Sequence, residues 1–131
     1  MHKTVMVVDD NETDLLLTRL TLERSGIAGQ LVLMRSAADA LAHLAGPGPA
    51  VDLILLDVNM PGMDGFEFLD HHTQRGLPTG PVSGPVPVVM LSASLDPAER
   101  ARALAHACVL DFVSKPLDLA KIAGLRAHLA D

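Results

Sequence analysis

Residues 51–57 read Val51-Asp52-Leu53-Ile54-Leu55-Leu56-Asp57, and they lead directly into the turn-rich stretch Val58-Asn59-Met60-Pro61-Gly62-Met63-Asp64-Gly65. A short, continuous apolar run of this kind is typical of a strand that is buried on both faces in a parallel sheet. Asp57 therefore stands where a buried strand opens into a tight loop. A carboxylate at that position is presented to its surroundings, and we interpret it as presented for chemistry.

Similar apolar runs recur along the chain and alternate with helix-like segments, which predicts a parallel sheet with helices on both faces. The predicted strands are residues 4–8, 30–34, 51–56, 87–91 and 109–113. The predicted helices cover residues 13–25, 37–45, 65–75 and 97–107, and the last begins at Asp118. We therefore expect an α/β fold with a doubly wound, five-stranded parallel sheet. The second strand is expected at the edge of the sheet, and the first and third at its centre.

Local capping signals support these helices. Asp96-Pro97-Ala98-Glu99 offers an N-cap acid, a proline at the first helical position and a glutamate three residues past the cap. Gly26 is placed to end the first helix as a C-terminal cap. In the last helix Ile122, Leu125 and Leu129 share one stripe, which is the spacing of a helix that packs on a sheet.

The composition indicates one domain, residues 1–131, with enough apolar surface for a two-faced sheet. A net charge of −6 without any run of basic residues argues against direct nucleic-acid binding. No apolar stretch approaches the roughly 18 residues that span a bilayer, and no signal-peptide core follows the N-terminus. The single Cys108 cannot form an intramolecular disulfide and fits a reducing compartment. We therefore expect no membrane partner and a cytoplasmic location.

Polar residues stand at the ends of four predicted strands: Asp9 and Asp10, Asp57, Ser92, and Lys115. Open α/β sheets bind ligands at the carboxyl ends of their strands, so we expect these side chains to lie together. Each one alone has an ordinary explanation as a helix cap, a loop hydroxyl or a solvated cation. Four strand ends in the right order make a chance arrangement improbable.

The residue types suit phosphoryl chemistry. Three crowded carboxylates repel one another unless a cation lies among them, and a hard divalent ion such as Mg²⁺ prefers oxygen ligands. With the ion bound, Asp57 can act as a nucleophile on a phosphoryl group while Lys115 neutralises its equatorial oxygens. Ser92 and the backbone N–H groups that follow the two strand ends, those of Asn59 and Ala93, are placed to donate to the remaining oxygens. The predicted product is an aspartyl phosphate.

Two other metal sites fail on spacing. Residues 57–62 begin like an EF-hand, but Pro61 occupies the fifth position and Phe68 the twelfth, where a bidentate Glu is needed. The adjacent His71 and His72 give no metal-ligand spacing, because neighbours on a helix point about 100° apart. We expect the histidines to lie on solvated faces.

Four motifs together resemble the receiver domain of the two-component response-regulator family, of the chemotaxis-regulator type. They are Val7-Val8-Asp9-Asp10-Asn11, Leu55-Leu56-Asp57-Val58-Asn59-Met60-Pro61-Gly62-Met63-Asp64-Gly65, Met90-Leu91-Ser92-Ala93 and Phe112-Val113-Ser114-Lys115-Pro116. The match extends over nearly the whole chain, and the second motif is especially specific. The resemblance implies a flavodoxin-like fold with strand order 2-1-3-4-5.

The resemblance also implies roles for the strand-end residues. Asp57 is expected to be the phosphoacceptor, and Lys115 the cation that pairs with the phosphoryl group. The expected Mg²⁺ ligands are Asp10, Asp57 and the backbone carbonyl of Asn59, with Asp9 acting through water.

A switch is implied as well. Ser92 is expected to move toward the phosphoryl group, and Phe112 falls where the family keeps a rotating aromatic residue. An ordinary role for Phe112 in the core of the last strand stays open. The Lys115-Pro116 bond is expected to be cis. Phosphorylation is then expected to shift a population of states and change the surface of the fourth helix, fifth strand and fifth helix.

The implied phosphoryl donor is a sensor histidine kinase or a phosphotransfer protein. Because the chain ends after the fifth helix, we expect no output domain, so the effect requires an unknown downstream protein target or onward relay of phosphate. The chain is expected to be a monomer or a homodimer through its fourth helix, fifth strand and fifth helix. It is not expected to be an enzyme beyond its own phosphorylation and dephosphorylation.

Two other hypotheses stay open. A Mg²⁺-dependent phosphohydrolase with an aspartyl nucleophile is disfavoured, because Asp9-Asp10-Asn11 lacks the required Asp-x-Asp spacing. A receiver-like module that binds partners without phosphorylation is the other.

The chain also departs from the family pattern. Cys108 stands where glycine is common, and Ser92 where threonine is commoner. The Gly/Pro-rich segment 76–87 is extra length. This segment and 46–49 join helices to strands, so we expect both at the sheet edge opposite the polar cluster.

Overall fold

The computed structural model describes residues 3–46, 50–58, 60, 62–74, 86–93, 96–106, 108–115 and 117–129. Strands and helices alternate throughout this part of the chain. The strands are β1 (Thr4–Val8), β2 (Gln30–Met34), β3 (Leu53–Asp57), β4 (Val88–Ser92) and β5 (Val109–Ser114). The helices are α1 (Glu12–Ser25), α2 (Ala37–Ala45), α3 (Gly65–Gln74), α4 (Pro97–Leu104) and α5 (Leu119–Leu129).

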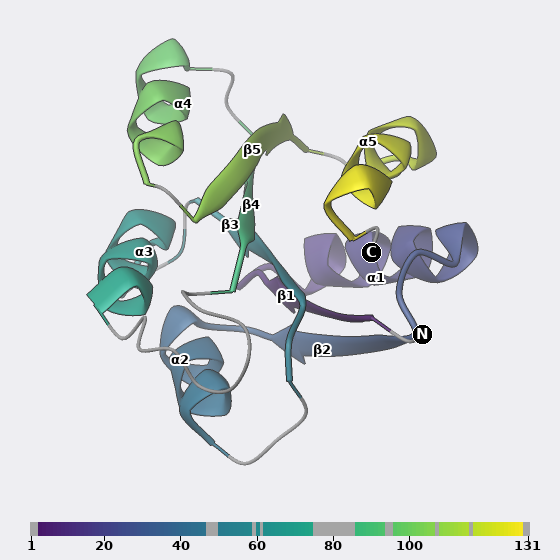
Figure 1. Cartoon of the computed structure of the whole chain (residues 1–131), viewed down its shortest axis with the longest axis horizontal. Coiled ribbons are helices and arrows are strands. Elements are labelled where there is room, and N and C mark those ends of the chain that lie inside the picture. Colours follow the sequence, from purple (N-terminus) through teal and green to yellow (C-terminus); the bar gives the residue numbers. More distant parts are fainter. Residues whose placement is uncertain are drawn as a thin grey trace.

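The strands form one parallel sheet in the order β2-β1-β3-β4-β5, which confirms the predicted fold class and strand order. Every residue of β1, β3 and β4 is buried, whereas the edge strands β2 and β5 are partly exposed. Helices α1 and α5 cover one face of the sheet, and α2, α3 and α4 cover the other (Figure 1). Among the described helices, none is long and apolar enough to cross a bilayer.

The sheet separates two hydrophobic clusters, because successive side chains of a strand point to opposite faces. Met6, Ile54 and Met90 belong to the cluster on the side of α2, α3 and α4. Val7 and Leu55 belong to the cluster on the side of α1 and α5. Continuous apolar strands are therefore required, since both faces of each central strand are buried.

Capping residues mark the helix ends, and two of them, Gly26 and Asp96, are those predicted from the sequence. The side chain of Asn11 accepts a hydrogen bond from the backbone N–H of Asp14 (3.0 Å), so α1 begins one residue before the predicted start. Gly26 has φ 68° and its N–H donates to the carbonyl of Glu23, as expected for a left-handed cap. Asp96 accepts from the N–H of Ala98 at 2.9 Å and opens α4.

Strand β3 begins two residues later than predicted and includes Asp57 as its last residue. Directly before the strand, the carboxylate of Asp52 accepts a hydrogen bond from the backbone N–H of Thr4 at 2.7 Å and so anchors the start of β1. Strand β4 likewise covers 88–92 rather than 87–91 and ends on Ser92. The two site residues are therefore the final residues of their strands.

Helix α4 ends at Leu104, so its predicted extension to residue 107 is wrong. The carbonyl of Cys108 accepts a hydrogen bond from the N–H of Val88 (2.8 Å), and the N–H of Val109 donates to the carbonyl of His106 (3.1 Å). The chain must therefore turn before residue 108 to enter the sheet, which leaves no room for another helical turn.

The histidines are not all solvated. His72 is buried, its ring stacks on Phe68 with centroids 5.5 Å apart, and its Nε2 lies 2.9 Å from the carbonyl oxygen of Val86. Residues four apart share a helix face, so the position that follows Phe68 by one turn also faces the core. Nε2 of His43 is buried too, without a hydrogen-bond partner among the described residues. His71 is exposed, as predicted.

Several predictions concern residues outside the described part of the chain. They are the Lys115-Pro116 peptide bond, the backbone groups of Asn59, and most of the Gly/Pro-rich segments, residues 47–49 and 76–85.

Candidate functional site

Sheet hydrogen bonds hold the polar residues at the carboxyl ends of the strands. The N–H of Asp9 donates to Met34 (3.0 Å), continuing the β1–β2 pairing one residue past the strand. The N–H of Lys115 donates to the carbonyl of Ser92 (2.8 Å), which links the ends of β4 and β5. Asp57 pairs in register with Leu91 of β4. The backbone at each position is therefore fixed by the sheet rather than by a free loop.

A glycine packs directly beneath the end of β3. The N–H of Gly65 donates to the carbonyl of Val58 at 2.9 Å. A Cβ at residue 65 would lie 2.7 Å from the backbone oxygen of Asp57 and 3.0 Å from the Cα of Val58. Because both neighbours are backbone atoms, only glycine fits here without moving the strand end that carries Asp57.

Three carboxylates meet at this edge of the sheet. Asp9, Asp10 and Asp57 each have one oxygen within 4.8 Å of the others. Asp9 and Asp57 are buried, whereas Asp10 is exposed. Both oxygens of Asp9 already accept hydrogen bonds, Oδ1 from the N–H of Asn11 (2.9 Å) and Oδ2 from the ammonium group of Lys115 (2.8 Å).

Lys115 contacts acids from three elements. Its Nζ lies 2.8 Å from Oδ2 of Asp9, 3.2 Å from Oδ2 of Asp14 and 3.2 Å from Oδ1 of Asp57. Burial alone would lower the pKa of Lys115. The hydrogen bond to Asp9 and the charges of Asp57 and Asp9 outweigh burial and raise that pKa above its ordinary value. Lys115 is therefore a firmly held cation.

One ammonium does not balance the acids around it. The carboxylates of Asp9, Asp10, Asp14 and Asp57 carry four negative charges and Lys115 carries one positive charge, which leaves an excess of three negative charges. Oxygen ligands with net negative charge are what a hard divalent cation such as Mg²⁺ prefers. The donor set therefore fits such an ion. The backbone carbonyl of Asn59, the other predicted ligand, lies outside the described residues.

Ser92 lies at the back of the site and is fully buried. Its hydroxyl donates to Oε1 of Glu99, on α4, at 3.4 Å. Ala93, the predicted backbone donor, follows Ser92 and is exposed. Phe112 is buried in the cluster under α2, α3 and α4, so it is a core residue in this structure. Its rotation between two states stays a prediction.

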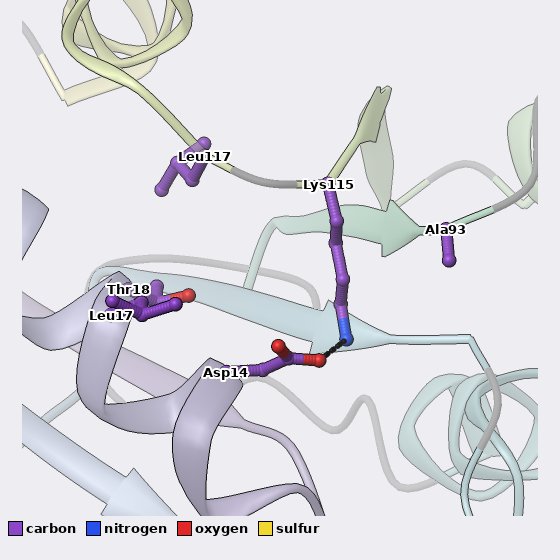
Figure 2. Close-up of a pocket in the computed structure, with 6 residues that line it drawn as sticks. All are labelled: Asp14, Leu17, Thr18, Ala93, Lys115 and Leu117. Carbon is purple, nitrogen blue, oxygen red and sulfur yellow. Dashed lines mark hydrogen bonds and ion pairs between the residues drawn. The ribbon is translucent and has the colours of Figure 1, made fainter.

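A cavity of about 210 Å³ lies beside these groups, and Figure 2 shows residues that line it. Leu17 and Thr18 of α1 line one side, and Leu117, in the segment before α5, lines another. The side chains of Asp14 and Lys115 meet at this cavity through an ion pair.

The sequence reasoning missed two residues of the site, Asp14 and Glu99. Both lie on helices, in the first turns of α1 and α4. A usable signal existed for Asp14, because the N-cap at Asn11 starts the helix directly after the acidic pair and keeps its first turn at the same sheet edge. No comparable signal marks Glu99, whose contact depends on how α4 packs.

Comparisons with known proteins agree on one family. The model of the response regulator receiver domain matches residues 5–125. Two-component response regulator ORR1 of Oryza sativa subsp. japonica is 30% identical over 128 residues, which cover 93% of this chain and 53% of the rice protein. This chain thus spans about half the length of that relative.

Solved structures show the same likeness. A two component response regulator from Cytophaga hutchinsonii has a TM-score of 0.86 at 28% sequence identity, over 99% of this chain and 98% of that chain. The Mn(2+)-bound form of response regulator Rcp1 has a TM-score of 0.75 at 27% identity, over 95% of this chain and 92% of that chain.

Proposed function

This chain belongs to the response regulator receiver domain family, and on that basis we propose that it is a signalling switch that accepts a phosphoryl group on Asp57. Receiver domains are signalling modules rather than enzymes that turn over a separate substrate. The observation that carries the proposal is the 3.2 Å contact between the Lys115 ammonium and a carboxylate oxygen of Asp57, at the end of a buried strand. The nucleophilic carboxylate therefore lies beside a cation that can stabilise the phosphorylated product.

In the proposed transfer, an oxygen of Asp57 attacks the phosphorus of a phosphohistidine on a kinase or phosphotransfer protein. The new P–O bond forms as the P–N bond to the donor imidazole breaks, and that nitrogen takes up a proton. Lys115 stabilises negative charge on an equatorial oxygen throughout, because its ammonium is already within ion-pair distance of Asp57. The product is an acyl phosphate on Asp57.

We propose that Asp10 and Asp57 bind Mg²⁺ directly, with the carbonyl of Asn59 as a further ligand. Asp9 is assigned an indirect role through water, because both of its carboxylate oxygens already accept hydrogen bonds. When bound, Mg²⁺ neutralises charge on the phosphoryl oxygens. The relative Rcp1, solved in a Mn(2+)-bound form, supports a divalent cation in this family.

The proposed readout begins at Ser92. Its hydroxyl donates to Glu99 of α4 in this structure. On phosphorylation we propose that Ser92 turns to a phosphoryl oxygen, as do the N–H groups of Asn59 and Ala93. Helix α4 then loses a link to β4, and Phe112 repacks beneath it. A coupling of about 1–3 kcal/mol is enough to change partner affinity several-fold or more.

The finer assignments follow from this mechanism. We propose a sensor histidine kinase or phosphotransfer protein as the donor, and a downstream protein that binds the surface of α4, β5 and α5. We propose that the chain acts in the cytoplasm. A second copy of the chain is an alternative occupant of the same surface.

The test is intact-protein mass spectrometry after incubation with acetyl phosphate and Mg²⁺. The wild type is expected to gain the mass of one phosphoryl group, and the gain is expected to disappear without Mg²⁺ or in Asp57→Asn. Asp70→Asn is the matched control, because Asp70 is an exposed acid on α3. It should be modified like the wild type.

Absence of an adduct in the wild type over a range of acetyl phosphate and Mg²⁺ concentrations would contradict the proposal. Partner binding that ignores beryllofluoride would then favour a module that works without phosphorylation. Repeated hydrolysis of a phosphate monoester would favour a phosphohydrolase instead.

A further inference from the structure

A third carboxylate on Lys115 stands apart from the proposed metal and phosphoryl ligands. Asp14 belongs to α1, and its Oδ2 lies 3.2 Å from Nζ of Lys115 (Figure 2). The other two acids on Nζ, Asp9 and Asp57, come from the ends of β1 and β3. Asp14 therefore links the reactive edge of the sheet to a helix.

The ammonium group has three N–H donors and no more. In this structure it donates hydrogen bonds to Asp9 and Asp14 and forms an ion pair with Asp57, so three carboxylates already share its charge. When a phosphoryl group is attached to Asp57, Lys115 must direct a donor to a phosphoryl oxygen. It can do so fully only by loosening one existing contact.

The solvent exposure of each aspartate side chain determines how costly it is to loosen its contact with Lys115. The side chains of Asp9 and Asp57 are 2% and 7% exposed, whereas that of Asp14 is 41% exposed. A buried carboxylate that loses its cation has no water to replace it, so releasing Asp9 is costly. A carboxylate that is two-fifths exposed is readily hydrated, so releasing Asp14 costs little.

Asp14 also has space beside it into which its side chain can move. Its side chain lines the cavity of about 210 Å³ that it shares with Leu17 and Leu117. This volume holds several water molecules, whose share of the liquid is about 30 Å³ each. The carboxylate can therefore turn away from Lys115 without displacing a packed side chain.

We propose that Asp14 is a positioning residue that holds Lys115 before phosphorylation and releases it to the phosphoryl group afterwards. This inference rests on the proposed function of Asp57. Asp14 favours the unphosphorylated arrangement, so it lowers the affinity of the site for a phosphoryl group. The release also frees the first turn of α1 from the sheet edge, which adds this helix to the surfaces that phosphorylation alters.

The test measures beryllofluoride affinity in the presence of Mg²⁺, by titration followed by heteronuclear NMR. Asp14→Asn is expected to bind beryllofluoride about two- to fivefold more tightly than the wild type, the range for one partly exposed ion pair. Asp14→Glu keeps the charge and should restore an affinity near that of the wild type. Lys115→Met, alone and combined with Asp14→Asn, completes a double-mutant cycle.

A matched control separates the contact between Asp14 and Lys115 from general repulsion of beryllofluoride by a nearby negative charge. Glu12→Gln removes the same charge from the same helical turn, where Glu12 pairs with Arg35 instead of Lys115. Glu12→Gln should bind as the wild type does. The effect of Asp14→Asn should vanish in the Lys115→Met background.

Three results would overturn the inference: Asp14→Asn binds no more tightly than the wild type, Glu12→Gln tightens binding equally, or the Asp14→Asn effect persists without Lys115. Failure of the wild type itself to bind beryllofluoride would instead overturn the proposed function, so the two failures are distinguishable.

Thermal unfolding without Mg²⁺ checks the contact between Asp14 and Lys115 directly. The four proteins compared are the wild type, Asp14→Asn, Lys115→Met and the double variant. We expect a coupling between Asp14 and Lys115 there, and additive effects would also overturn the inference.

Discussion

Replacing Lys115 with methionine should strongly destabilise the protein in the absence of Mg²⁺. The ammonium is the cation that contacts the side chains of Asp9 and Asp57, which are only 2% and 7% exposed. Methionine keeps much of the apolar stem but supplies no charge. Two buried carboxylates would then lose the charge of Lys115, and breaking a buried ion pair in this way costs about 3–5 kcal/mol.

The expected loss lies near the lower end, at about 3 kcal/mol. Lys115 is itself 15% exposed, so some water reaches the acids when the ammonium is removed. Its contact with Asp14, which is 41% exposed, adds less than about 1 kcal/mol. For a domain of 131 residues this loss corresponds to a fall in Tm of about 10 °C.

The pH dependence has a definite sign, because the pKa of Lys115 is raised in the folded state. An unfolded lysine has a pKa of about 10.4, so the stabilisation by Lys115 is fully present below that pH. It is lost as the pH rises toward the higher pKa of the folded state. Lys115→Met should therefore lose less stability than the wild type as the pH rises above about 10.

Urea denaturation followed by circular dichroism measures both effects. Lys115→Arg, which restores the charge, is expected to recover much of the unfolding free energy at neutral pH. If Lys115→Met unfolds within about 1 kcal/mol of the wild type at neutral pH, the reasoning that Lys115 compensates two buried acids is refuted.

Three further outcomes are expected. Mg²⁺ at about 100 times its Kd should stabilise the wild type by about 2.7 kcal/mol, and a thermal shift that persists in Asp10→Asn would argue against that acid as a ligand. Gly65→Ala should cost about 1–3 kcal/mol in urea denaturation, because its Cβ would lie 2.7 Å from the backbone oxygen of Asp57. Asp52→Ala should cost about 1–3 kcal/mol, because the buried N–H of Thr4 loses its acceptor, while Asp52→Asn should lose less.

The fold class was predictable because both faces of each central strand are buried. That burial forces the continuous apolar runs of β1, β3 and β4, and those runs are visible in the sequence. Exact boundaries were not predictable. The carboxylate of Asp52 binds the backbone of Thr4, and the carbonyl of Cys108 joins the sheet. Both are contacts between segments distant in the chain, which local patterns do not report.

The residues of the candidate site also differ in how far local sequence patterns predict them. Asp9, Asp57 and Lys115 follow from the sequence because strand ends of a parallel sheet share one edge. Asp14 and Glu99 come from helices, and their contacts with Lys115 and Ser92 depend on how each helix is rotated against the sheet. That rotation is set by packing of the whole helix face rather than by the few residues near the site.

His72 illustrates the limit of judging a residue by type. The histidines, including the adjacent His71 and His72, are predicted to lie on solvated faces. The ring of His72 is buried instead, because Phe68, one turn earlier, turns the same helix face to the core.

The proposed function requires the Asp57 carboxylate itself to carry the phosphoryl group. Borohydride reduction of the protein after acetyl phosphate treatment converts an aspartyl phosphate to homoserine, and peptide sequencing by mass spectrometry then locates it. We expect homoserine at residue 57 and unmodified aspartate at residues 9 and 10. Homoserine at either of those two positions, or at none of the three, would contradict it.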